Sequence, residues 1–427
     1  MTNTTFLKDI CTNLNLIDSN FKFKFINNQK IIFPEFLCKN INIIINELNN
    51  HTTNIDFSFF IFEGELDFSG VSFEKTALFV GCTFLRKVSF NKSNFKNGVL
   101  FSSSIFEENV IFGKIFLGKN TAYIPVVFNN YINFYNVSFL KYADFNGVYF
   151  NGVTYFSEAK FFKGADFTNT CFKEDSYFDE ILSNDTLNFS DADFIKKANF
   201  KNLTSFNLIF FNTTFRDIIN FQNSFVKNEL SFHQAIFFNY ARFFIKKVKY
   251  LKFDDSFYSL GFSFLCIAEE NIENIELASQ KTYCLLKNVA NYTNNKRLKN
   301  LMFCREMSQQ LALLKNNKCS LFDDDFIILT FNKISNNFGL SWKRGIIFTL
   351  ISSLIFFVLY SFSAQDLSIT SFLTDKFFQN FLIFLYPGSF EKNFSNSISI
   401  LFYFIGKVFI FLGLYQTIQA FRKLHEQ

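Results

Sequence analysis

The residues of this chain that could do chemistry are few and far apart. His51, His233 and His425 lie distant from one another in the sequence, and the eight cysteines form no C-x-x-C pair. No local set of zinc ligands can therefore be assembled. The densest acidic run, Asp323–Asp325, has no further oxygen ligands nearby for a divalent cation. We expect it to be a solvated helix N-terminus, and we predict no metal and no cofactor.

Motifs of the common catalytic sites are also absent. The sequence contains no G-x-x-x-x-G-K-[ST], no G-x-G-x-x-G after a strand, no G-x-S-x-G and no H-E-x-x-H. We therefore predict that the protein is not an enzyme and has no catalytic residues. One group remains, Lys407, which lies inside a long apolar segment, where an ionisable residue suggests a function. It could face a partner helix or a wet groove during assembly, take part in conduction or gating, or mark a misplaced segment boundary.

Phenylalanine lies on a regular lattice in the first half of the chain. The sequence has 70 Phe and only 3 Pro among 427 residues, and from Phe57 to Phe211 every eleventh residue is aromatic. A second register follows five residues after the first, with Leu117 and Ser183 as its exceptions. Spacings of five and six do not match the 3.6-residue period of a helix. Small residues two positions before most of these Phe are instead typical of short strands.

Glycines mark where this chain would turn. Gly70, Gly81, Gly147 and Gly152 each follow two residues after a lattice Phe, where a tight corner needs freedom in φ. We predict a coil of short extended faces, with Phe rings stacked in ladders and backbone hydrogen bonds between coils. The predicted core includes Phe68, Phe73, Phe79, Phe84, Phe90, Phe145, Phe150, Phe156, Phe161, Phe167 and Phe172.

These repeats resemble the pentapeptide-repeat family, in the variant F-S-G-x-x-F-x-x-x-A-D-F. Residues 66–73 read L-D-F-S-G-V-S-F and residues 143–150 read A-D-F-N-G-V-Y-F, and the resemblance covers about 57–253. It implies a mainly β fold, a right-handed, four-faced parallel β-helix with Phe inside and roughly nine coils. Bulges or loops are expected at the weak coil 114–123 and near 206–210, where the lattice loses one residue.

The charge of the repeat region argues against nucleic acid as a partner. Some pentapeptide-repeat proteins mimic DNA with a strongly acidic surface. Residues 55–255 carry 21 Lys and Arg against 21 Asp and Glu, so they form no continuous negative field. Direct binding to phosphates would need excess cation, which is also missing.

Other segments flank the repeats. Residues 276–292 and 295–315 are typical of two amphipathic helices. We expect an αα-hairpin that closes the solenoid, with a partner-binding or oligomerising helix pair as the alternative. The predicted organisation is an N-terminal cap at 1–50, a β-solenoid at 51–255, a helical hairpin and linker at 256–325, and a membrane domain at 326–427.

Two long apolar segments end the sequence. Residues 345–365 contain no charge, and residues 398–420 are interrupted only by Lys407. Each is long enough to cross about 30 Å of hydrocarbon as a helix. Positive residues next to both segments place the two termini in the cytoplasm by the positive-inside rule. Residues that we assign to anchoring, or to a pore, are Trp342, Lys343, Arg344, Pro387, Gly388, Lys407, Arg422 and Lys423.

The apolar stretch 377–386 between these segments is too short to span a bilayer. It would lie in the interface or dip in as a re-entrant segment that ends at Pro387-Gly388. Segments 332–344 and 415–423 are similar to parts of bacterial pentapeptide-repeat membrane proteins with a C-terminal two-helix region. Residues 1–20 show no secretory signal peptide. The expected location is the bacterial inner (cytoplasmic) membrane, multi-pass, with solenoid and C-terminus in the cytoplasm.

Two functions remain compatible with this sequence. In the first, the solenoid is a membrane-tethered scaffold that binds an unknown protein partner. In the second, the two helices and segment 377–386 form an oligomeric channel with the solenoid as its sensor, although no T-V-G-Y-G filter is present. A membrane-breaching defence effector is a third alternative. A pore predicts that Lys407 faces a shared axis, whereas a tether predicts that Lys407→Leu is harmless.

Overall fold

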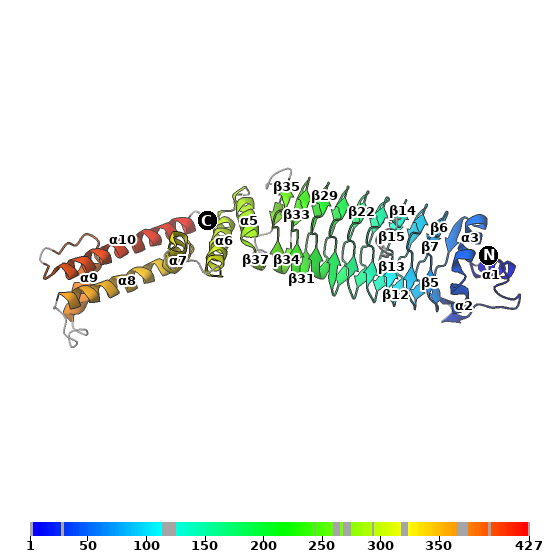
Figure 1. The fold of residues 1–427 in the computed structure, drawn as a ribbon, viewed down its shortest axis with the longest axis horizontal. Helices are drawn as coiled ribbons and strands as arrows, with labels where there is room; N and C mark the ends of the chain where they lie inside the picture. The colour runs from blue at the N-terminus through cyan, green and yellow to red at the C-terminus, as the bar shows by residue number, and fades with distance from the viewer. Residues whose placement is uncertain are drawn as a thin grey trace. The chain divides into compact units, whose positions relative to one another are not determined.

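The computed structural model describes residues 3–26, 30–112, 125–243, 245–258, 265–267, 275–292, 294–316, 323–364, 375–391 and 394–425. The chain divides into two compact units, Met1–Ala278 and Ser279–Gln427. All strands of the described residues belong to the first unit, and the second is helical (Figure 1).

The first unit is a parallel β-solenoid of about eight turns, which confirms the predicted fold class. Through most of it, each short strand pairs in parallel with the strand four positions further along the chain, so that four strands make one turn. The eighth and ninth strands, Thr83–Phe84 and Val88–Ser89, pair in this way with Ile105–Phe106 and Val110–Ile111. Figure 1 shows these strands stacked side by side.

The strands fall into three sheets, of which the largest covers two faces of the solenoid. Its strands are β1 (Phe25–Ile26), β2 (Lys30–Phe33), β4 (Phe60–Phe62), β5 (Leu66–Asp67), β8 (Thr83–Phe84), β9 (Val88–Ser89), β12 (Ile105–Phe106), β13 (Val110–Ile111), β16 (Ser138–Phe139), β17 (Ala143–Asp144), β20 (Lys160–Phe161), β21 (Ala165–Asp166), β24 (Leu182–Ser183), β25 (Thr186–Asn188), β28 (Thr204–Ile209), β31 (Ser224–Ser231), β34 (Ile245–Lys252) and β37 (Ile275–Ala278).

The other two sheets form one face each. The second sheet comprises β6 (Ser72–Phe73), β10 (Asn94–Phe95), β14 (Val127–Phe128), β18 (Tyr149–Phe150), β22 (Cys171–Phe172), β26 (Asp193–Phe194), β29 (Thr214–Phe215), β32 (Ile236–Phe237) and β35 (Phe257–Tyr258). The third comprises β3 (Asn54–Asp56), β7 (Thr76–Leu78), β11 (Val99–Leu100), β15 (Ile132–Asn133), β19 (Thr154–Tyr155), β23 (Ser176–Tyr177), β27 (Ala198–Asn199), β30 (Ile219–Asn220), β33 (Ala241–Phe243) and β36 (Leu265–Ile267).

Phenylalanine ladders fill the solenoid. The eleven Phe assigned to the core from the sequence are each at most 1% exposed. The ring of Phe167 stacks on those of Phe145 and Phe189, with 4.7 Å between centroids in both pairs. Phe156 meets the same ring edge-on at 5.3 Å. Stacking between turns and edge contacts across the core are both favourable for aromatic rings, so each Phe is held by several others.

The lattice is interrupted in one turn. An unbroken eleven-residue lattice places Tyr123 above Phe101, but Phe101 stacks on Phe134 at 5.1 Å. Likewise Phe106 stacks on Phe139 rather than on Phe128. Residues that stack here are therefore 33 apart in the sequence instead of 22, and the solenoid has about eight turns rather than the predicted nine. Leu117 and Tyr123 themselves lie outside the described residues.

The predicted slip near 206–210 is confirmed. Strand β28 runs for six residues through what is a corner in the preceding turns, and its register with β31 shifts between Ser205 and Asn207. Ser183 takes the position that Phe fills one turn earlier at Phe161, and its hydroxyl donates to the carbonyl of Asp185 at 3.0 Å. A hydroxyl with its own acceptor can be buried in an aromatic core at little cost.

Two of the corner glycines show why glycine is needed, for different reasons. Gly81 has a φ of +65°, the left-handed conformation expected for a corner. Gly152 does not have a positive φ, which corrects the sequence-based assignment. A Cβ at Gly152 would lie 2.2 Å from the carbonyl oxygen of Asn130, so this glycine permits close approach between neighbouring turns.

The first 50 residues cover the N-terminal edge of the solenoid. They form α1 (Asn3–Asn13), α2 (Glu35–Cys38) and α3 (Ile41–His51), with β2 paired in parallel to β4. Asn49 of α3 satisfies the edge strand β6: its amide nitrogen donates to the carbonyl of Ser72 at 2.7 Å, and its oxygen accepts from the backbone of Glu74 at 2.9 Å. An edge satisfied in this way is not free to pair with another chain.

The solenoid continues beyond residue 255, where the sequence-based boundary was drawn. Strands β36 and β37 pair in parallel with β33 and β34, and Leu277 lies opposite Tyr250. Leu277 was expected in a helix beginning at 276, but α5 begins at Gln280. Backbone hydrogen bonds between strands need no aromatic side chain, so the solenoid turns continue past the end of the Phe pattern that predicted them.

The second unit contains six helices among its described residues. They are α5 (Gln280–Tyr292), α6 (Lys296–Asn316), α7 (Asp324–Asn336), α8 (Trp342–Ser363), α9 (Asp375–Leu385) and α10 (Ser397–His425). Asp323 caps α7 by accepting from the backbone of Phe326 at 3.2 Å, as expected for the acidic run.

The helix pair α5–α6 belongs to this unit. Lys287 and Glu306 join the two helices through a 2.6 Å ion pair, in which Glu306 is only 7% exposed. Cys304 and Leu311 of α6 pack with Leu329 of α7 and with Phe338. The sequence-based role of this pair, closing the solenoid, stays a prediction.

Candidate functional site

Helices α8 and α10 pack closely because small residues lie between them. A Cβ at Gly413 would lie 2.1 Å from the Thr349 hydroxyl oxygen, and one at Gly345 would lie 2.4 Å from that of Thr417. Each threonine donates to a carbonyl of its own helix, so neither hydroxyl is left unsatisfied. Small residues that allow close backbone approach are typical of helix pairs in membranes.

The outward surfaces of these two helices are apolar. Only 28% of the most apolar part of α8 and 33% of that of α10 is buried. Ile347, Ile351 and Ile355 are each more than half exposed on α8, as is Phe411 on α10. Exposed apolar surface of this extent is rare on soluble monomers. By length and composition both helices could cross a membrane.

The short helix α9 packs on this pair. Its residues Phe377, Phe381 and Phe384 surround Phe357 of α8, with ring centroids 5.3 to 5.5 Å apart. Its opposite side exposes Leu382, which is 62% accessible. Residues 377–385 of the sequence-based segment 377–386 therefore form part of helix α9, which packs against α8 and α10, and Tyr386 follows the end of this helix.

Lys407 of α10 caps the C-terminal end of α9. Its ammonium donates to the carbonyl oxygens of Phe384 and Tyr386, both at 2.8 Å, and to the hydroxyl of Ser389 at 2.7 Å. Only 7% of this lysine is exposed. The last carbonyls of a helix lack partners within it and carry partial negative charge, so a buried ammonium there is compensated.

This geometry decides what Lys407 does within the chain. The ammonium of Lys407 donates to the end of α9 and to the turn after it, which contains Pro387 and Gly388. Tyr403, one helical turn before Lys407 on α10, donates to the carbonyl of Ser389 in the same turn at 2.9 Å. Lys407→Leu, which the tether predicts to be harmless, would take the donor from the carbonyl of Phe384. The carbonyl of Tyr386 would still accept from the backbone amide and the hydroxyl of Ser389, at 3.1 and 2.9 Å. The harmlessness of this change stays a prediction. Ser389 and Tyr403 were missed in the sequence, where only the charge stood out.

A buried amide cluster joins α7 to α10 near the other end of the pair. The side-chain nitrogen of Asn336 donates to the side-chain oxygen of Gln416 and, at 3.3 Å, to that of Gln419. Gln416 donates in turn to Asn332 at 3.1 Å. The two segments resembling other membrane proteins, 332–344 and 415–423, thus meet here. In the sequence, Asn332 and Asn336 are four residues apart and Gln416 and Gln419 are three apart. This spacing puts each pair on one helix face and could have predicted the cluster.

Positive residues gather at this end. Trp342 stacks on Phe421 at 4.9 Å, which brings the start of α8 beside the end of α10. Lys343 and Arg344 are exposed, and Lys423 donates to the carbonyl of Phe338 at 3.1 Å. Trp342, Lys343, Arg344, Arg422 and Lys423 therefore lie at one end of the pair, whereas Pro387, Gly388 and Lys407 lie beside α9.

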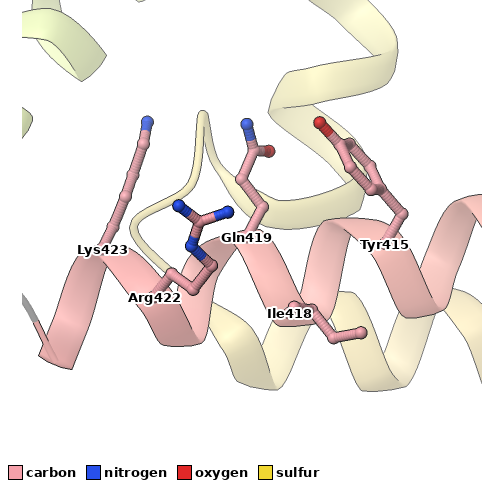
Figure 2. A pocket seen from close by; sticks show the side chains of 5 residues that line it. All are labelled: Tyr415, Ile418, Gln419, Arg422 and Lys423. Carbon is pink, nitrogen blue, oxygen red and sulfur yellow. The ribbon is translucent and has the colours of Figure 1, made fainter.

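A pocket lies along the last turns of α10. Figure 2 shows Tyr415, Gln419, Arg422 and Lys423 extending to one side of the helix, with Ile418 also lining the hollow. Its volume is about 280 Å³. Every polar side chain of this lining can donate a hydrogen bond, and two of them are cationic.

Two aspartates stand side by side on the outer surface of the solenoid. Asp144 of β17 pairs in register with Asp166 of β21. Burial, together with the neighbouring charge of Asp166, raises the pKa of Asp144 to about 6, although the backbone of Asn146 donates to its carboxylate at 2.9 Å. The charged form of Asp144 is therefore disfavoured in the folded state.

We expect Asp144→Asn to stabilise the solenoid at pH 7 by about 1–2 kcal/mol, after allowance for partial solvent screening. The folded state of the wild type retains a proton between pH 3.8 and about 6 that the unfolded state has lost. The stability of the wild type should therefore fall as the pH rises through that window, and Asp144→Asn should not show this fall.

The measurement is the free energy of unfolding of both proteins at pH 4, 5, 6 and 7. Asp67→Asn is the control, because Asp67 is exposed and lies opposite Ser89. Identical pH profiles for Asp144→Asn and wild type would contradict the prediction.

No group of three or more His, Cys, Asp or Glu that could hold a metal ion occurs among the described residues. Burial raises the pKa of the Cys38 thiol to about 11, so this cysteine is protonated at neutral pH.

The comparisons with known proteins agree with the repeat geometry. Residues 134–182 match the family model for pentapeptide repeats (9 copies). The solenoid is thus a pentapeptide-repeat solenoid, followed by a region with two candidate membrane helices. No curated protein and no solved structure matches the chain.

Proposed function

We propose that this protein is a membrane-tethered, non-catalytic scaffold whose pentapeptide-repeat solenoid binds a protein partner. The observation that carries the proposal is the apolar outward surface of α8 and α10, which a lipid bilayer would cover. By the positive-inside rule, the cationic residues at one end of the pair support a cytoplasmic location for that end and for both termini in this proposal. The resemblance of segments 332–344 and 415–423 to bacterial membrane proteins supports the bacterial inner membrane as the proposed location.

The solenoid supplies a repetitive surface suited to a protein partner. Tyr131, Tyr155 and Tyr177 form an outward ladder along the third sheet, with centroids 5.3 and 4.8 Å apart. Stacked repeats commonly serve as extended binding surfaces, and tyrosine is enriched at protein interfaces. We place the partner on this face.

A channel is the weaker alternative. A pore lined by Lys407 would require its ammonium to face a shared axis, but that group is hydrogen-bonded within its own chain to the end of α9. A homo-oligomer without such a pore remains compatible with the scaffold.

The membrane part of the proposal is tested by one substitution and its matched control. Ile351→Arg puts a charge on the outward side of α8, where insertion into hydrocarbon costs about 2.5–3.5 kcal/mol. Ile334→Arg makes the same change at an equally exposed residue of α7, outside both candidate spans. We expect the wild type and Ile334→Arg to resist carbonate extraction from membranes, and Ile351→Arg to be released. Extraction of the wild type would contradict the tether.

The partner is sought by replacing Tyr155 with a photoreactive phenylalanine analogue in the full chain. We expect one discrete adduct that is absent when the analogue stands at Phe162, which is exposed on another face. Equal adducts from both positions would argue against a partner on the tyrosine face.

A further inference from the structure

The pocket at the end of α10 combines hydrogen-bond donors with two positive charges, Arg422 and Lys423. Helices α8 and α10 contain no Asp or Glu among their described residues, and the only carboxylates of α7, Asp324 and Asp325, lie in its first turn, at the end away from Asn336. Among the described residues, no carboxylate forms an ion pair with Arg422 or Lys423. Glu426, the nearest carboxylate in sequence, lies outside the described residues. Within the part of the chain that the structure describes, an anion would therefore meet both cations without a competing carboxylate.

The amide cluster and the α7–α8 turn hold this lining in place. Gln419 is fixed through its oxygen by Asn336, which orients its amide nitrogen, a hydrogen-bond donor. Lys423 is anchored on the carbonyl of Phe338 and lies 5.0 Å from the ring centre of Phe303. An ammonium has three protons, so Lys423 keeps donors for a ligand while it stays in position.

The lining changes from apolar to cationic along the helix. Ile418 and Tyr415, 59% and 61% exposed, precede Arg422 and Lys423 by one to two turns. At 1.5 Å per residue this gradient extends over about 12 Å. That is longer than the interfacial layer of one leaflet, about 5–8 Å, so the lining can reach from the headgroups into the hydrocarbon. Trp342, stacked on Phe421 beside the pocket, is the residue type that favours that layer.

We infer that this pocket binds the phosphate of an anionic phospholipid, with Arg422 and Lys423 at the phosphate and Ile418 along the acyl chain. The inference rests on the proposed membrane insertion and specifies which lipid the anchor selects. Arginine and lysine are the common phosphate-binding residues, and Gln419 and Tyr415 add neutral donors.

Trp342 is the only tryptophan of the chain and therefore reports on this end alone. The full-length protein is placed in vesicles of phosphatidylcholine that contain a small fraction of phosphatidylglycerol, with bromine on the acyl chains of one lipid or the other. Bromine quenches Trp342 fluorescence on contact. We expect the anionic lipid to quench about fivefold more than its mole fraction predicts, with the excess falling at high salt.

Two substitutions locate the effect. Arg422→Gln should abolish most of the excess quenching. Arg344→Gln removes one positive charge at the same end of the helix pair, but Arg344 does not line the pocket. This variant should therefore retain the excess quenching. Equal loss in both variants would indicate a general surface charge and overturn the pocket. Loss of the excess on addition of millimolar inorganic phosphate, at an ionic strength matched with chloride, would identify free phosphate as the ligand and overturn the lipid assignment.

The outcomes separate this inference from the proposed function. No quenching by either brominated lipid would mean that α8 and α10 do not insert, so the tether itself fails. Quenching by both lipids in proportion to their mole fractions would leave the tether standing and overturn the phosphate site alone.

Discussion

Replacement of Phe167 by alanine is expected to lower the free energy of unfolding of the solenoid by about 3–5 kcal/mol. Phe167 is fully buried and stacks on Phe145 and Phe189 in the turns on either side. Its removal leaves a cavity that rings held by their own neighbours cannot fill. Because each turn is stabilised chiefly by the next, the defect should weaken the cooperation between the two halves of the solenoid.

Phe162→Ala is the matched control for this experiment. It makes the same chemical change in the same turn, but Phe162 is 36% exposed on the outer surface. We expect a loss below about 1 kcal/mol. Both variants are compared with wild type by denaturant unfolding followed by circular dichroism. If Phe167→Ala proved as stable as Phe162→Ala, the ladder would not be the main source of stability.

Replacement of Lys407 by methionine is expected to release α9 from α8 and α10. Methionine keeps the apolar stem but removes the ammonium from the carbonyls of Phe384 and Tyr386 and from the hydroxyl of Ser389. The carbonyl of Phe384 is then left buried without this donor, which costs about 1–3 kcal/mol, whereas the carbonyl of Tyr386 still accepts from the amide and hydroxyl of Ser389. The loss should be comparable with that of a core cavity, although confined to α9.

Hydrogen exchange in detergent measures this effect directly. The amides of residues 376–385 should exchange at least tenfold faster in Lys407→Met than in wild type, whereas those in the middle of α8 should not change. Lys376→Met is the control, because Lys376 is exposed at the opposite end of α9. Unaltered protection of α9 in Lys407→Met would show that the cap does not hold this helix. The result would then favour the pore, in which the same lysine serves conduction.

Much of the solenoid is determined by local sequence pattern. Phe73 and Phe79 each face the core because strands place alternate side chains on opposite faces, and repetition of the pattern leaves few other ways to bury so many rings. The same holds for the two long apolar helices, whose length and composition are visible without any tertiary contact.

Contacts between residues distant in sequence were decided only by the tertiary structure. The stacking of Phe101 on Phe134 depends on the number of residues in the turn between them, which the repeat pattern does not give. The strand that contains Leu277 pairs through backbone groups that every residue has, so no side-chain pattern marks it. The partners of Lys407 lie about twenty residues away across a helix crossing, and those of Asn336 lie further still. Periodicity reports which face of an element is buried, but not which buried groups meet, because that depends on the packing of whole elements.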